Sequence, residues 1–186
     1  MNKIIRAIDF AAEKHRNQRR KDAERTPYIN HPVALANVLA NEAGISDENV
    51  LVAAVLHDTI EDTQTTADEL HDIFGPLVCK IVQEVTDDKS LPKQERKRLQ
   101  VEHAPNLSKS AKLIKLADMI SNLRDMAVNP PADWDIDRKR GYFHWAYAVV
   151  AGLRGVHPGL EYLFDEAYNE GIGEVYGVML NTGVPN

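Results

Sequence analysis

One short stretch, residues 57–62 (HDTIED), holds four ionisable side chains and follows the apolar run of residues 50–56 directly. If one helix continues through both segments, its period of about 3.6 residues places His57 one turn from Glu61 and Asp58 one turn from Asp62. One imidazole and three carboxylates at the end of a buried helix could hold a divalent metal and leave acids beside it for proton transfer. The stretch therefore predicts a metal-dependent hydrolase that acts on a phosphorylated small molecule.

Two other segments could bring further metal ligands to this stretch. His31 stands beside Pro32 at an expected helix start, and Asp118 follows an apolar segment at a position that should face the core. A buried carboxylate costs several kcal/mol unless it is paired or binds a metal. Alone, His31 could be a hydrogen-bonding residue of a helix start and Asp118 a partner in a buried salt bridge. Together, His31, His57, Asp58 and Asp118 form a mixed nitrogen and oxygen set that suits Mn²⁺, Fe²⁺ or Zn²⁺ better than Ca²⁺ or Mg²⁺.

The composition narrows the class of protein. The 186 residues fit one domain, and their net charge of −6 argues against nucleic acid as the main partner. Cys79, the one cysteine, excludes an internal disulfide and a cysteine-rich metal site, and its apolar neighbours predict a buried thiol. We expect no membrane partner and a cytoplasmic location, because no apolar run reaches about 18 residues and the N-terminus shows no signal-peptide pattern.

Apolar residues recur at helical spacing along most of the chain, and no segment alternates as a strand would. The fold class is therefore all-α. We expect one domain over residues 1–170 and a loosely ordered tail over residues 171–186, where no clear period is found. The expected helices span about residues 3–16, 32–44, 47–62, 66–75, 76–85, 92–103, 108–126, 136–153 and 158–169.

Several motifs give the chain a resemblance to a known family. They are KHRNQRRK at 14–21, PYINHP at 27–32, HDTIEDT at 57–63, EVTDDK at 84–89, KLAD through NLR at 115–124, and YFHW at 142–145. Over roughly residues 5–165 the chain resembles the HD-domain phosphohydrolases. It is most similar to the hydrolase domain of RelA/SpoT-type enzymes, especially the small stand-alone alarmone hydrolases of the metazoan SpoT-homologue type.

The resemblance implies a fold, a metal and a reaction. The fold would be an HD-domain helical bundle, with Mn²⁺ on His31, His57, Asp58 and Asp118. The reaction would remove the 3′-diphosphate of ppGpp or pppGpp to give GDP or GTP and pyrophosphate. Met119 and Ser121 depart from the family pattern, which more often has a basic residue and an aromatic or histidine there. Only hydrolysis is implied, because the synthetase domain of the long family members cannot fit in 186 residues.

Roles follow for the remaining polar residues near these motifs. Glu61 and Asp62 are predicted to orient the attacking water and pass protons, and the alternative for both is a solvated helix end. Arg20, Lys21 and Lys93 are predicted to contact phosphates, since a metal flanked by carboxylates needs cations nearby to admit a polyanion.

Asn122 and Tyr142 complete the predicted substrate-binding set. Asn122, one turn after Asp118, could touch the ribose or a phosphate, whereas Tyr142 could stack on or bond to the nucleoside or belong to the core. A solvated helix face is the favoured interpretation of Arg96, Lys97 and Arg98. The histidines outside the metal set are expected to be surface or structural residues: His15, His71, His103, His144 and His157.

Two other functions remain open at this point. An HD-domain phosphatase for a deoxynucleoside monophosphate or NADPH would use the same metal site, because that site specifies phosphate-ester hydrolysis and not the leaving group. The basic run Arg19-Arg20-Lys21 favours a substrate that carries a diphosphate. A non-catalytic nucleotide-binding module is the alternative from another class, and the complete set of ligands and acids argues against it.

Overall fold

The computed structural model of the 186-residue chain describes residues 2–131 and 133–181, with side chains as far as residue 173. Helices make up nearly all of the described chain, and no strand occurs in it beyond one isolated bridge between Arg19 and Pro27. The all-α prediction is confirmed. The helices are α1 (Asn2–Lys14), α2 (Asn30–Asn37), α3 (Glu48–Leu56), α4 (Thr59–Asp62), α5 (Ala67–Phe74), α6 (Pro76–Val85), α7 (Lys93–His103), α8 (Lys109–Val128), α9 (Ile136–Ala151) and α10 (Pro158–Asn181), with a π-helical turn η1 (Val38–Glu42) and a 3₁₀ turn η2 (Ala104–Asn106).

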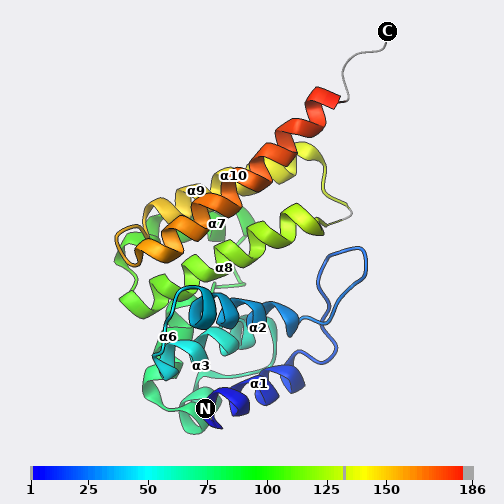
Figure 1. The fold of residues 1–186 in the computed structure, drawn as a ribbon. Coiled ribbons are helices and arrows are strands. Elements are labelled where there is room, and N and C mark those ends of the chain that lie inside the picture. The colour runs from blue at the N-terminus through cyan, green and yellow to red at the C-terminus, as the bar shows by residue number, and fades with distance from the viewer. Residues whose placement is uncertain (1, 132, 182–186) are drawn as a thin grey trace.

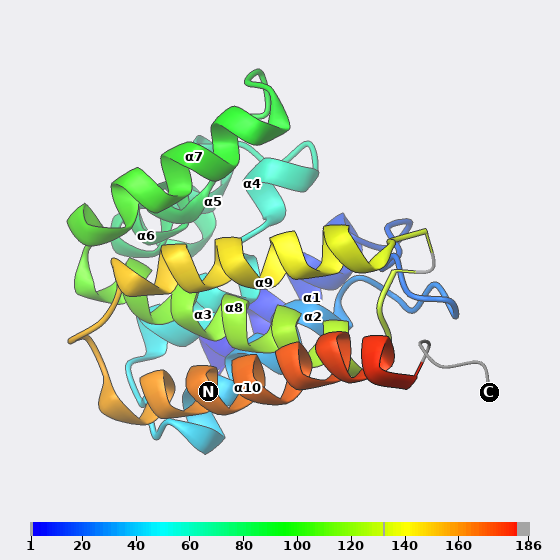
Figure 2. The same ribbon diagram turned by 90° about the horizontal axis from the view of Figure 1, so that it is seen from above.

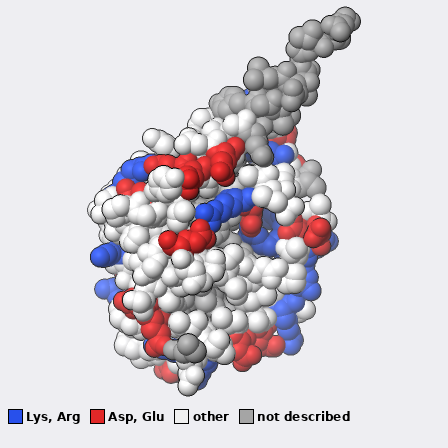
Figure 3. All heavy atoms as spheres, viewed as in Figure 1, with Lys and Arg blue, Asp and Glu red and all other residues white. Residues whose placement is uncertain are grey.

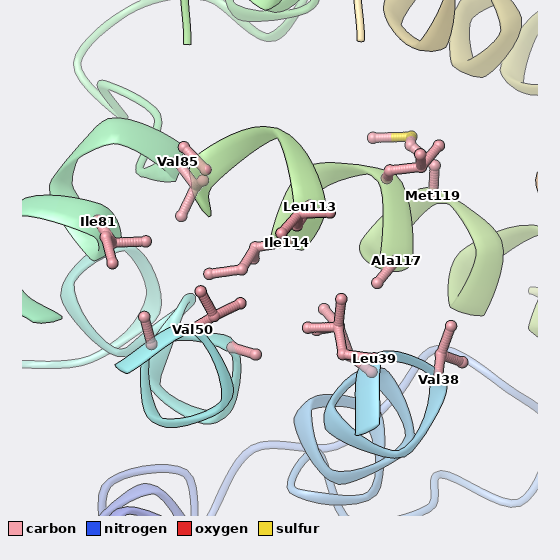
Figure 4. Close-up of a cluster of buried hydrophobic side chains, with 14 of the residues drawn as sticks. Val38, Leu39, Val50, Ile81, Val85, Leu113, Ile114, Ala117 and Met119 are labelled. Carbon is pink, nitrogen blue, oxygen red and sulfur yellow. The ribbon is translucent and has the colours of Figure 1, made fainter. Parts of the chain in front are cut away.

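Two helices form the centre of the bundle. All seven residues from Val50 to Leu56 of α3 are buried, because α1, α2, α6 and α8 surround this helix (Figure 1). α8 crosses the molecule between α2 and α3 on one side and α9 and α10 on the other. The close-up in Figure 4 shows side chains of α3, α6, α8 and η1 meeting in this core, among them Val50, Ile81, Ile114 and Leu39.

The remaining helices flank this centre. Seen from above in Figure 2, α4 to α7 gather on one side of α9, and α10 lies on the other. On the face drawn in Figure 3, lysine and arginine are interspersed with aspartate and glutamate and form no continuous basic surface. None of the described helices is long and apolar enough to cross a membrane. The prediction that Cys79 is buried is confirmed, since its exposed fraction is 6%.

The central helix differs from the continuous helix considered from the sequence. α3 ends at Leu56, and α4 begins at Thr59 after Asp58, whose backbone angles are φ −98° and ψ 0°. The Thr59 hydroxyl donates to the Leu56 carbonyl (2.7 Å), which satisfies one backbone oxygen that the helix break sets free. The polar stretch therefore turns as it leaves the core instead of continuing along one axis.

The last helix also extends beyond its expected end near residue 169. α10 crosses Gly171 and continues to Asn181, whereas residues 182–186 lie outside the described part. Gly171 sits against the Phe143 ring of α9, so closely that an added Cβ would lie 2.4 Å from the ring. Gly171 is thus a point of close packing between α9 and α10.

Candidate active site

Three helices bring the centre of the site together. His31 lies in the first turn of α2, His57 follows α3, and Asp118 lies within α8. One possible ligand atom from each of the three side chains lies within 4.8 Å of the other two. Both histidines are buried and Asp118 is half-buried, with His31 Nε2 at 3.1 Å from Asp118 Oδ1. Two imidazoles and a carboxylate at this spacing form a donor set that suits a transition-metal ion.

Hydrogen bonding fixes the ring of His57. Its Nδ1 lies 2.8 Å from the Ala54 carbonyl oxygen, which can only accept, so Nδ1 carries the hydrogen and Nε2 faces the site. Burial lowers the pKa of His57, but the Asp58 and Asp118 carboxylates outweigh burial and hold that pKa above its ordinary value. A proton on Nε2 therefore compensates these carboxylates until a metal displaces it.

Asp58 lies beside the group of His31, His57 and Asp118 but is not one of the three residues whose ligand atoms lie within 4.8 Å of one another. Its Oδ2 lies 3.0 Å from His57 Nε2 and accepts a hydrogen bond from the Tyr28 hydroxyl. Burial raises the pKa of Asp58, but the neighbouring imidazoles and the Tyr28 hydroxyl lower it by more than burial raises it, so the net shift is downward. The carboxylate thus stays ionised beside the histidines, as a metal ligand must be.

Glu61 and Asp62 lie at the rim of the site, each held by other residues. Glu61 Oε2 accepts from the backbone N–H of Asp87 (3.0 Å), and Asp62 Oδ2 accepts from Gln18 Nε2 (2.8 Å). Lys89 donates to Asp62 and lies 3.5 Å from Glu61 Oε1. Burial raises the pKa of Glu61, so this carboxyl is suited to hold a proton.

A cleft of about 750 Å³ opens beside these acids. Its lining includes His31, Glu61, Asp62 and all five residues that the sequence predicts to bind substrate: Arg20, Lys21, Lys93, Asn122 and Tyr142. These five come from the loop after α1 and from α7, α8 and α9, so the fold brings distant segments to one cavity.

Asn122 connects the metal centre to the cleft wall. Its Nδ2 donates to Asp118 Oδ1 (2.6 Å), and its Oδ1 accepts from Arg20 (3.2 Å), which also donates to Asp125 (2.6 Å). The Asn122 amide is therefore engaged at both ends by protein side chains, and its predicted contact with substrate stays a prediction.

Three aromatic rings lie next to one another, and two of them, Trp134 and Tyr142, line the cleft. Tyr142 lies 5.6 Å from Trp134 and 5.3 Å from Trp145, centroid to centroid. Lys93 lies 5.8 Å from the centre of the Trp134 ring, and Lys97 lies 4.4 Å from the centre of the Trp145 ring. Tyr142 thus packs against the core and lines the cleft at the same time, and its predicted contact with the nucleoside stays a prediction.

The charged face of α7 corrects the expectation for two residues and confirms it for a third. Arg96 is not solvated, because its NH1 lies 3.7 Å from both Glu61 Oε1 and Asp87 Oδ2. Lys97 is half-buried over the rings and was also wrongly expected to be solvated. The prediction for Arg98 is confirmed, since it forms surface pairs with Glu95 and Glu102 of its own helix.

Sequence reasoning assigned no role to four side chains that contact the site: Gln18, Tyr28, Lys89 and Arg96. Gln18, Tyr28 and Lys89 lie inside the motifs of the resemblance, which was the only available signal for them.

Comparison with known proteins fits this geometry. Residues 7–155 match the family pattern described as HD domain. The chain is 58% identical over 158 residues to the guanosine-3′,5′-bis(diphosphate) 3′-pyrophosphohydrolase MESH1 of Homo sapiens, covering 85% of this chain and 88% of that protein. It is 54% identical over 167 residues to the protein of the same name from Danio rerio, covering 90% of this chain and 93% of that protein.

A solved structure gives the same result. It is described as a metazoan orthologue of SpoT that hydrolyses ppGpp and plays a role in starvation responses. It superposes on this chain with a TM-score of 0.89 at 51% identity, covering 91% of this chain and 96% of that one. The chain therefore belongs to the HD-domain family, within its MESH1-type group of SpoT homologues.

Proposed function

We propose that the protein is a metal-dependent guanosine-3′,5′-bis(diphosphate) 3′-pyrophosphohydrolase, which converts ppGpp or pppGpp into GDP or GTP and pyrophosphate. The observation that carries the proposal is the group of His31, His57 and Asp118, which lies beside two acids at a cleft with cations in its lining. Relatives that share more than half of their residues with the chain carry this activity in their names.

The metal is proposed to be Mn²⁺, held by His31, His57 and Asp118 with Asp58 as a fourth ligand. The mixed nitrogen and oxygen donors support this choice, and so does the Asp58 Oδ2 atom at 3.0 Å from His57 Nε2. When bound, such an ion lowers the pKa of a water molecule and polarises the phosphoryl group under attack.

The two acids divide the proton transfers. Hydrolysis joins the water oxygen to the phosphorus on the ribose 3′-oxygen and breaks that P–O bond, so water loses a proton and the 3′-oxygen gains one. Asp62, which accepts from Gln18 and Lys89, is placed to receive the proton of the water. Glu61, whose pKa burial raises, is the better donor to the departing 3′-oxygen.

The cleft cations would hold the substrate phosphates. Burial lowers the pKa of Lys93, and nearby Arg138 and Lys21 lower it further, so an anion bound there would relieve repulsion between cations. Arg20 and Lys21 are proposed to contact the diphosphate, Asn122 the ribose or a phosphate, and Tyr142 the nucleoside.

Two further parts of the proposal rest on the sequence. The HD-domain unit is taken as residues 1–170, with a short C-terminal segment after it, and the enzyme is placed in the cytoplasm.

The test is pyrophosphate release from ppGpp by chelator-treated protein, with and without added Mn²⁺. GDP and pyrophosphate should appear only with the metal and should vanish in Asp58→Ala, whereas Asp72→Ala should behave as wild type because that side chain is 81% exposed. Turnover of a deoxynucleoside monophosphate or NADPH, with none of ppGpp, would keep the metal chemistry and overturn the substrate. Silence on all three would favour a binding module.

A second variant tests the diphosphate directly. Changing Arg20 and Lys21 together to alanine should reduce turnover of ppGpp far more than turnover of any simple nucleotide that the enzyme accepts. An equal loss on both would show that these cations do not select the 3′-diphosphate.

A further inference from the structure

A chain of two side-chain hydrogen bonds connects the end of α1 to the acid Asp62. Gln18 Nε2 donates to Asp62 Oδ2 (2.8 Å), and Gln18 Oε1 lies 2.7 Å from His15 Nδ1. His15 is buried, with 2% of its surface exposed, although it lies outside the metal group. The sequence alone gave it no partner.

The direction of each hydrogen bond in this chain is determined. An ionised carboxylate oxygen only accepts, so Gln18 must turn its NH₂ group toward Asp62 and its carbonyl oxygen toward His15. That oxygen also only accepts, so the hydrogen lies on His15 Nδ1. His15 Nε2 is buried and has no partner within the described chain, and a bare nitrogen there costs less than an unpaired N–H.

The same imidazole also supports the metal side of the site. Its ring lies 4.8 Å from the Tyr28 ring at an interplanar angle of 34°, and the Tyr28 hydroxyl donates to Asp58. Backbone hydrogen bonds hold the segment in place, from Gln18 N–H to the His15 carbonyl (2.8 Å) and from Tyr28 N–H to the Gln18 carbonyl (3.1 Å). His15 thus connects to the acid Asp62 through the hydrogen bonds of Gln18. It connects to Asp58, a predicted metal ligand, through its packing against Tyr28.

We propose that His15 and Gln18 are positioning residues for the reaction, an inference that rests on the proposed function. The Nδ1–H of His15 holds Gln18, which aims the Asp62 carboxylate at the attacking water. The ring of His15 holds Tyr28, which aims Asp58 at the metal. Proton transfer and metal binding both depend on such fixed geometry, so each contact should have its own kinetic consequence.

Two substitutions of His15 separate these contacts. In His15→Asn the side-chain amide can replace the Nδ1–H donor, but the ring is lost. In His15→Phe the ring remains, but the donor is lost. Gln18→Met keeps the length of the side chain, removes its amide and leaves the backbone hydrogen bonds of the segment intact.

We expect His15→Phe and Gln18→Met to lower kcat at saturating Mn²⁺ by about tenfold or more, with little change in KM or in Mn²⁺ affinity. His15→Asn should keep kcat much closer to wild type but bind Mn²⁺ several-fold more weakly, as measured by calorimetric titration of the stripped protein. His71→Phe and His71→Asn are the matched controls, because His71 is exposed on α5, and neither should change kcat or metal affinity.

Thermal melts identify any variant that fails to fold. If the His15 variants do not fold, Gln18→Met still tests whether the hydrogen bond to Asp62 supports kcat. Wild-type kcat in folded His15→Phe and Gln18→Met would overturn the proposal, and so would equal losses of kcat in both His15 variants. If wild type is silent on ppGpp but hydrolyses another nucleotide, the proposed substrate fails and the same variants test positioning on that nucleotide. If wild type hydrolyses nothing, the Asp62 arm fails with the proposed function.

Discussion

Two neighbouring groups at the cleft hold their cations in opposite ways. In the first, which we name the acid wall, cations lie against carboxylates. It consists of Glu61, Asp62, Lys89 and Arg96 in the cleft lining, with Asp87 beside them. In the second, the ring wall, cations lie over aromatic faces. It consists of Trp134, Tyr142 and Lys93 in the cleft lining, with Trp145 and Lys97 packed against Tyr142.

The pKa shifts of the lysines show the difference between the two walls. Burial lowers the pKa of Lys89, but Asp62 and Glu61 outweigh it and raise that pKa. Burial and neighbouring cations lower the pKa of Lys97 to about 8, and neither Lys93 nor Lys97 forms an ion pair within the described residues. The carboxylates of the acid wall are therefore paired with cations and fixed before substrate arrives, as catalytic groups require, whereas the ring wall retains positive charge that an anion would neutralise.

The largest expected effect comes from the acid wall. Glu61→Gln and Asp62→Asn keep the shape of each side chain but remove its capacity to transfer a proton. We expect kcat for ppGpp to fall by roughly 10²–10⁴ with little change in KM, measured as steady-state pyrophosphate release. A raised KM with an unchanged kcat would mean that these acids contact substrate rather than protons.

A matched pair on α7 tests whether the cations of the acid wall matter. Arg96→Met leaves Glu61 and Asp87 without a neighbouring guanidinium, so we expect kcat to fall by about tenfold, which corresponds to about 1.4 kcal/mol in the barrier. Arg98→Met, two residues away, removes only surface pairs with Glu95 and Glu102 and should leave kcat unchanged. Similar losses in both variants would instead point to general damage to α7.

Two pairs of residues show what the sequence could and could not predict. His57 and Asp118 were predictable because a polar side chain next to buried apolar residues needs a partner. Arg96 and Arg98 were not distinguishable, because α7 buries none of its residues completely and therefore carries no apolar stripe to mark its inner face.

Backbone details escaped prediction for a related reason. The break at Asp58 is accompanied by the hydrogen bond from Thr59 to Leu56, and the length of α10 by the contact between Gly171 and Phe143. Local propensity does not report such contacts, since each depends on how neighbouring segments pack. The all-α class and the presence of the five predicted substrate-binding residues in the cleft lining, in contrast, followed from periodicity and from the resemblance.

A smaller effect is expected on the ring wall. Lys93→Met should raise the KM for ppGpp about tenfold, the cost of one charge-assisted contact of about 1.5 kcal/mol, with a smaller change in kcat. Lys80→Met on the exposed surface of α6 is the control and should leave KM unchanged. If Lys93→Met lowers kcat and leaves KM alone, the division between the two walls is wrong.

The smallest effect concerns stability and its dependence on pH. The pKa of Lys97 is about 8 in the folded protein and about 10.5 when unfolded, so the folded state disfavours its charge. This cost is fully present below pH 8. It disappears as pH rises towards 10.5, where the folded protein has already lost the proton that the unfolded chain still binds. Lys97→Met should therefore raise Tm by about 1–3 °C at pH 7, because Lys97 is partly exposed and its contact with Trp145 offsets part of the cost.

The gain in Tm should shrink to nothing near pH 10.5, and Lys80→Met should show no such trend. At pH 7, added pyrophosphate should make the Tm of wild type higher than that of Lys97→Met. An anion on the ring wall stabilises the charged lysine in wild type and finds less charge in the variant. A gain in Tm that is independent of both pH and pyrophosphate would mean that methionine merely packs better than lysine. The charge of Lys97 would then not destabilise the folded protein, and the proposed contrast between the two walls would fail.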